Sequence, residues 1–138
     1  MPRLIDWLRH RPLEAWVTAV LVTSAVVFVL FQLQPGLLFL DTTPAGGDMG
    51  AHVWGPAYLR EELLPRFRLS GWAPDWYDGF PAYQFYMVIP SLLIVILDVV
   101  LFVPYNIAFK LIAVSGLLAL PVAAWALAKL ARLSLIHI

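Results

Sequence analysis

The 138-residue sequence contains no cysteine. Disulfides, thiol nucleophiles and cysteine-ligated metals are therefore excluded, and the redox compartment stays undetermined. Charge is also scarce, because charged residues make up 13% of the chain and nine basic residues balance nine acidic ones. A nucleic-acid interface needs a basic excess gathered on one face, so this balance argues against a nucleic-acid partner.

Apolar residues are correspondingly abundant in the sequence. They make up 62% of the chain, against about 45–50% in an ordinary soluble domain, and the mean hydropathy is +0.82. A water-soluble fold of this size cannot bury so much apolar surface. We therefore expect an all-α integral protein of the cell membrane, with the lipid bilayer as its solvent.

Three apolar runs are long enough to cross a bilayer and predict a multi-pass chain. They cover residues 13–33, 86–103 and 107–130. Between the second and third runs, Pro104 and Asn106 predict a tight turn, because proline ends one helix and asparagine can cap the next. These two transmembrane helices are therefore expected to form an antiparallel hairpin.

The two ends of the chain carry separate expectations. Three arginines within residues 1–12 precede the first run and favour a cytoplasmic N-terminus, although basic residues on the two sides of the membrane otherwise balance. The first run is longer than the apolar core of a signal peptide, so it predicts a retained anchor. Residues 133–138 look like a translated sequencing adapter and are expected to be an artefact, the alternative being the start of a fourth apolar segment.

Two charges lie within the expected hairpin. Asp98 is six positions before Pro104, and Lys110 is six positions after it. At a rise of about 1.5 Å per residue, both reach a similar depth, roughly one turn inside the membrane. We predict a structural ion pair between them. The alternative is a functional role, because ionisable groups inside membrane segments often mark a transport path.

The connection at residues 34–85 is far longer than usual, which indicates a functional loop. It mixes charged side chains with tryptophans and tyrosines, a composition typical of the membrane–water interface. Residues 56–64 predict a short helix bounded by prolines. Because Leu59 and Leu63 share one face of it, we expect this helix to lie in the plane of the interface.

The loop also contains the candidate catalytic and binding residues. Asp48 and His52 are four apart, so on a helix they share a face and can form a carboxylate–imidazole pair or part of a metal site. Asp48 is equally explained as a helix N-cap, and His52 as an interfacial histidine bonded to backbone. Arg66 can contact phosphate or lipid headgroups. Trp72 and Trp76 are suited to stacking on sugar rings or to packing onto membrane helices.

The order of these features along the chain resembles that of a known protein superfamily. A first helix, a large loop and a second helix are combined with the loop residues Gly47-Asp48, His52, Trp72, Pro74 and Gly79-Phe80-Pro81. This arrangement resembles the amino-terminal module of the GT-C superfamily, whose members are multi-pass glycosyltransferases that use polyprenyl-phosphate sugar donors. Within it, the chain is most similar to the bacterial membrane family called "6-pyruvoyl-tetrahydropterin synthase related", a label that does not signify pterin chemistry. The resemblance covers residues 13–132.

The resemblance implies inverting transfer of a sugar from a polyprenyl-phosphate donor to an extracytoplasmic acceptor, with loop 34–85 on that side. The family's loop acid corresponds to Asp48, which would be the general base. Asp41 is a second candidate acid, or else marks the membrane exit. Some members hold a divalent metal with loop acids, so Mg²⁺ or Mn²⁺ is an implied cofactor although no metal ligand is assigned here. The substrate-binding candidates are His52, Arg66, Trp72 and Trp76.

A complete member of that family has more spanning helices and usually a carboxy-terminal soluble domain. The chain is therefore expected to be a truncated GT-C-like module, inactive without the remaining helices of the full-length protein. Two alternatives from other classes remain. In a transporter or lipid-handling protein, Asp98 and Lys110 line a path. In a non-catalytic membrane scaffold, Asp48 is only a helix cap.

Overall fold

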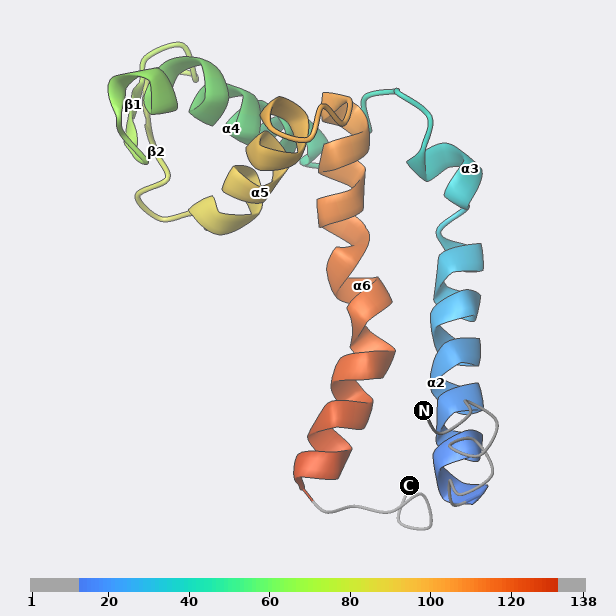
Figure 1. Cartoon of the computed structure of the whole chain (residues 1–138). Coiled ribbons are helices and arrows are strands. Elements are labelled where there is room, and N and C mark those ends of the chain that lie inside the picture. The colour runs from blue at the N-terminus through green and yellow to red at the C-terminus, as the bar shows by residue number, and fades with distance from the viewer. Residues whose placement is uncertain (1–12, 132–138) are drawn as a thin grey trace. The chain divides into compact units, whose positions relative to one another are not determined.

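The computed structural model describes residues 13–131 (Figure 1). The expectations of a cytoplasmic segment at 1–12 and of an artefact at 133–138 concern parts of the chain outside the described residues. The described range is mostly helical and contains one small antiparallel sheet. The chain divides into two compact units: Met1–Pro35 with Ser115–Ile138, and Gly36–Val114.

Two helices are long and apolar enough to cross a membrane, and they occupy the first and third expected spans. α2 (Leu13–Gln32) has 20 residues and α6 (Tyr105–Leu130) has 26. At about 1.5 Å per residue they measure about 30 and 39 Å, enough for a hydrocarbon core of about 30 Å. In their most apolar stretches, 6% of the α2 residues and 0% of the α6 residues are buried in the protein. Most of these side chains are therefore exposed or half-buried, as lipid-facing side chains are.

The second expected span, residues 86–103, is a shorter helix than predicted. α5 (Val88–Val99) has 12 residues, or about 18 Å, which is less than the core thickness. The chain turns back directly after it, because the Val103 amide donates to the carbonyl of Leu97 at 3.0 Å. Phe102 takes a left-handed φ of 55° within this reversal. The predicted hairpin is thus a short helix followed by a long one.

The long loop contains more helix than the sequence predicted. After α3 (Pro35–Leu38), α4 (Met49–Tyr58) continues into a π-helical turn, η1 (Leu59–Leu63), and a 3₁₀ turn, η2 (Leu64–Arg66). The helix predicted at 56–64 therefore begins seven residues earlier, and Pro56 lies inside it. Proline lacks the amide that an α-helix needs at this point, and the wider π-helical turn follows it.

The apolar face of this helix is buried in protein rather than resting on the bilayer as predicted. Leu59 is 0% and Leu63 is 3% exposed, and both pack against Val95 of α5. A second cluster joins Ile94 of α5 to Phe109 of α6. Full burial of such a side chain is worth about 1.5–3 kcal/mol. These contacts hold α5 between η1 and the first turns of α6, as Figure 1 shows.

A β-hairpin follows the helical segment. β1 (Gly71–Ala73) and β2 (Phe80–Ala82) are antiparallel, with Trp72 opposite Pro81. Gly79 has a φ of +109°, and a Cβ at this position would collide with the ring of Trp72. Glycine is therefore required for the close approach of the ring to the turn. The Tyr58 hydroxyl donates to the carbonyl of Trp72 at 3.0 Å and fixes the hairpin on the helix.

Leu59→Ala is expected to lower the free energy of unfolding by about 2–5 kcal/mol, because it leaves a cavity between η1 and α5. Thermal unfolding in detergent, followed by circular dichroism, measures the loss. The control is Phe67→Ala, since Phe67 is 99% exposed, and its effect should stay within about 0.5 kcal/mol. Equal losses in the two variants would contradict the packing described above.

Candidate functional site

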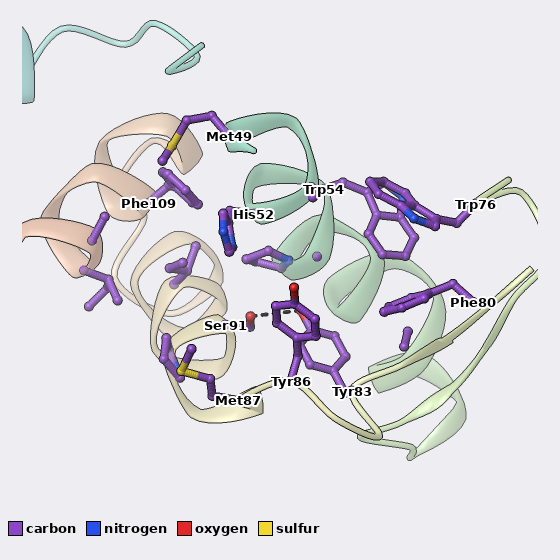
Figure 2. A pocket seen from close by; sticks show the side chains of 18 residues that line it. Met49, His52, Trp54, Trp76, Phe80, Tyr83, Tyr86, Met87, Ser91 and Phe109 are labelled. Carbon is purple, nitrogen blue, oxygen red and sulfur yellow. Dashed lines mark hydrogen bonds between the residues drawn. The ribbon is translucent and has the colours of Figure 1, made fainter. Parts of the chain in front are cut away.

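The unit formed by Gly36–Val114 contains a cavity of about 550 Å³ (Figure 2). Its walls come from α4, β2 and the segment after it, α5, and the first turns of α6. Most lining side chains are apolar or aromatic, and the polar groups among them include His52, Tyr83 and Ser91. Sites for small molecules typically have about 300–1,000 Å³ and this composition. The cavity is therefore the candidate binding site.

Aromatic rings form a continuous arc along the cavity. The centroids of Trp54 and Trp76 are 4.5 Å apart. Phe80 lies 6.4 Å from Trp76, and Tyr86 lies 6.4 Å from Phe80. The His52 ring completes the arc, 6.4 Å from Tyr86 and edge-on to it. These spacings lie in the range of favourable ring pairs, so the rings stabilise one another and present an apolar wall.

A pair of hydroxyls supplies polarity on another side of the cavity. Tyr83 donates a hydrogen bond to Ser91 Oγ at 2.9 Å, drawn as a dashed line in Figure 2. Gly55 of α4 lies against the phenol, and a Cβ there would be 3.0 Å from its oxygen. Burial raises the pKa of the Tyr83 phenol, and the hydrogen bond to Ser91 opposes this rise. The phenol is therefore neutral at physiological pH and remains a hydrogen-bond donor.

The predicted pair of Asp48 and His52 lies at the start of α4. Asp48 occupies the N-cap position, but its exposed side chain makes no capping hydrogen bond. Its backbone carbonyl accepts from the His52 amide at 3.2 Å. His52 lines the cavity together with Met49, the neighbour of Asp48 (Figure 2). The Asp48 carboxylate thus stands one residue from the cavity wall and is not used as a cap.

The other predicted binding residues are divided between the cavity and the surface. Trp76 lines the cavity, whereas Trp72 and Arg66 are not among the lining residues. Trp72 is 62% exposed, and its ring lies against the hairpin turn. Arg66 forms an ion pair with Glu62 at 2.8 Å, and both side chains are largely exposed. The fold therefore brings His52 and Trp76 together and leaves Trp72 and Arg66 apart from them.

Among the cavity residues that were not predicted from the sequence are three with hydroxyl groups: Tyr83, Tyr86 and Ser91. Tyr86 and Ser91 fell within the apolar run that was expected to cross the membrane. Their polar groups were available as a signal, because Tyr86 begins the stretch and Ser91 interrupts its apolar residues. Nothing local to that stretch indicates that it folds over α4.

The predicted ion pair between Asp98 and Lys110 is not formed. Asp98 is paired instead with Arg60 of η1, and the side chains are 18% and 31% exposed. The cause is the early end of α5, which places Asp98 in the last turn of a helix packed against η1. Hydrogen bonds to Glu61 and to Asp98 raise the pKa of the Arg60 guanidinium. Arg60 also lies 5.1 Å from the centroid of the Tyr105 ring.

Lys110 has a different role from the one predicted. Its ammonium donates to the backbone carbonyl of Leu37 at 2.8 Å and also to that of Leu40. One turn earlier in α6, the Asn106 amide donates to the carboxylate of Asp41 at 2.9 Å. Carbonyls after a helix end need such partners. Lys110 and Asn106 therefore fix the segment after α3, and Asp41 is engaged in this contact.

The donors of the described chain do not fit the Mg²⁺ or Mn²⁺ site that the family resemblance implies. Among residues 13–131, no three His, Asp or Glu side chains gather where they could hold one ion. Asp41 is bonded to Asn106, and Asp48 has His52 as its neighbour along the helix. Hard divalent cations take several oxygen ligands, which this pair does not supply.

No protein-family model, curated protein or solved structure matches this chain. The site is an amphipathic, ring-lined cavity with the exposed Asp48 one residue from its wall, in a chain with two helices that are long and apolar enough to cross a membrane.

Arg60→Gln is expected to lower stability by about 1.5–3 kcal/mol, because it removes the charged hydrogen-bond partner of Asp98. In a double-mutant cycle with Asp98→Asn, thermal unfolding in detergent should give a coupling of about 0.5–3 kcal/mol. Lys110→Gln is the control, and its coupling to Asp98→Asn should stay below about 0.5 kcal/mol. Coupling of Asp98 to Lys110 in place of Arg60 would refute the observed pairing.

Proposed function

We propose that the chain belongs to a multi-pass protein of the cell membrane, with α2 and α6 as spans and its N-terminus in the cytoplasm. The length and exposed apolar surfaces of both helices support this. The arginines ahead of α2 support the orientation, because basic residues are retained on the cytoplasmic side. In this arrangement the end of α2, the start of α6 and the cavity between them in sequence lie on the extracytoplasmic side.

We further propose that the cavity binds a polyprenyl-phosphate-linked sugar and that the protein transfers this sugar to an extracytoplasmic acceptor. The cavity beside Asp48 is the observation that carries the proposal. Its aromatic arc suits an isoprenoid chain and the apolar faces of a sugar ring. His52 supplies a group that donates to a phosphate oxygen, through either tautomer or as the imidazolium. The GT-C resemblance implies a catalytic role for Asp48, whereas the role of His52 at the donor phosphate is inferred from its chemistry alone.

In the proposed reaction, Asp48 is the general base. It takes the proton of the acceptor hydroxyl while that oxygen forms a bond to the anomeric carbon of the donor sugar. The bond from this carbon to the lipid phosphate breaks at the same time, and its electron pair leaves on the phosphate. Attack from the face opposite the phosphate inverts the anomeric carbon. The exposed, uncapped side chain of Asp48 supports this role, because its lone pairs are available to the acceptor.

The transport alternative has lost its main support. It required Asp98 and Lys110 to line a path, and both are engaged in contacts within the fold. Asp98 is neutralised by Arg60, and the Lys110 ammonium is bound to backbone carbonyls of α3 and of the segment after it. The scaffold alternative differs from the proposal only in the role of Asp48, so an activity measurement separates the two.

Asp48→Asn is expected to lower sugar transfer from a polyprenyl-phosphate donor by about 10²–10⁴-fold, because an amide cannot take the acceptor proton. Membrane vesicles with a radiolabelled donor measure the rate, and sedimentation with membranes checks insertion. Asp78→Asn is the matched control, since Asp78 is an exposed loop acid and neither it nor its two chain neighbours line the cavity. Equal activity of the Asp48 variant and the parent would refute the catalytic role and favour the scaffold.

Binding can be tested apart from catalysis. Trp76→Ala is expected to weaken binding of a polyprenyl phosphate by about tenfold or more, because it removes one ring of the arc and its buried area. Native mass spectrometry of the detergent-purified protein measures the bound fraction. Trp72→Ala is the control, because this ring lies on the hairpin outside the cavity. If Trp72→Ala weakened binding more than Trp76→Ala did, the cavity would not be the site.

A further inference from the structure

The two sides of α5 differ in what covers them. One side carries Ile94 and Val95, which are 4% and 6% exposed and pack on α6 and η1. The opposite side is apolar but uncovered. Its residues follow the helical spacing of four, three and four, and they are 68%, 44%, 47% and 61% exposed: Ile89, Leu93, Ile96 and Val100. We call these four residues the apolar stripe of α5.

The apolar stripe contains no charged residue that would favour its exposure to water. Asp98 is the one ionisable residue of α5, and it is paired with Arg60 on the side packed against the protein. The exposed apolar surface continues beyond the C-terminal end of α5, since Leu101 is 60% and Phe102 is 87% exposed. A contiguous apolar surface of this kind marks contact with a membrane or with a protein.

The position of α5 in the chain distinguishes between these partners. α6 begins six residues after α5 ends, and α6 is long and apolar enough to cross a membrane. The C-terminal end of α5 therefore lies at the same membrane surface as the first turn of α6. Because Ile94 packs on Phe109 of α6, α5 is also held against the side of that turn. Its apolar stripe therefore lies near the point at which α6 enters the proposed membrane.

The helix is nonetheless too short to cross. Its 12 residues cover about 18 Å of a core of about 30 Å. The reversal at Phe102 and the hydrogen bond from Val103 to Leu97 prevent its extension at the C-terminal end. At the other end, Met87 is extended before the first helical turn. An extended segment in the hydrocarbon core would leave its backbone groups unsatisfied.

We propose that α5 is a monotopic membrane helix. It lies along the bilayer surface on the side where α6 begins, with its apolar stripe in the acyl chains, and it does not cross. The partner of the stripe is lipid hydrocarbon. The chain then crosses the membrane twice, through α2 and α6, and not three times. This inference rests on the proposed membrane topology of α2 and α6 and is independent of sugar transfer.

The position of α5 also gives the cavity a route of access. Tyr86, Met87 and Pro90 line the cavity from the N-terminal end of this helix. With the stripe in the acyl chains, these residues lie at the level of the lipid headgroups. A ligand whose chain remains in the bilayer can therefore enter the cavity sideways, without leaving the membrane.

The absence of native cysteine makes a direct topology test possible. Ser70→Cys and Pro104→Cys place single thiols before and after α5, at exposed positions. A membrane-impermeant maleimide, applied to intact cells and to inverted vesicles, should label both from the same side. Labelling after detergent solubilisation shows that each thiol is reactive. Labelling from opposite sides would overturn the inference for α5 alone, whereas a chain absent from membranes would overturn it together with the proposed topology.

Depth measurements test the orientation of the helix. Nitroxide labels are placed on single cysteines along the apolar stripe, at Ile89, Leu93, Ile96 and Val100. Their accessibility to oxygen and to a water-soluble nickel complex reports the depth of each label in lipid vesicles. All four should lie at a similar depth, below a label on Ser70→Cys. A steady change of about 16 Å from first to last, as a crossing helix gives, would overturn the proposal.

Discussion

The contact between η1 and α5 is the constraint on which the rest of the Gly36–Val114 unit depends. Leu59 and Val95 are buried against each other in this contact, and the ion pair of Arg60 and Asp98 lies at its edge. Because η1 continues α4 without a break, fixing η1 on α5 also fixes the face of α4 that carries His52. The cavity lies between α4 and α5, with further walls from β2, the segment after it and the first turns of α6.

The same contact explains why the cavity is amphipathic. Its aliphatic and aromatic surfaces come from elements that must be apolar to pack, whereas two of its polar groups are hydrogen-bonded to each other. Tyr83 and Ser91 satisfy one another, and Gly55 leaves room for the phenol. His52 is held among rings at an exposed end of α4. A ligand with an apolar chain and a polar head matches this division.

The long helices could be predicted from local signals, but the start of α4 could not. Unbroken apolar runs indicated α2 and α6, whereas the prolines that bound residues 56–64 indicated only the later part of the helical segment that begins at Met49. The end of α5 could not be predicted, because Leu101 and Phe102 continue the apolar run while the backbone reverses. Hydropathy reports the solvent that side chains prefer and not the direction of the chain.

The residue partners were harder to predict than the elements. The pairing of Asp98 with Lys110 was inferred from symmetrical spacing about a turn, which holds only for two long antiparallel helices. The actual partner, Arg60, is 38 residues away in the chain, and its approach depends on packing that no local pattern encodes. Trp72 and Trp76 are likewise similar in sequence context, but the register of a short hairpin places one ring on its turn and the other in the cavity.

The central claim is that the cavity holds a lipid-linked sugar. The most direct test is photo-crosslinking in membranes with a polyprenyl-phosphate sugar that carries a diazirine on its sugar, followed by mass spectrometry of the labelled peptides. The account predicts labels on cavity residues of α4 and on the segment from Phe80 to Ser91, with loss of labelling when unmodified donor competes. Labels confined to the lipid-facing surfaces of α2 and α6, unaffected by competition, would contradict it.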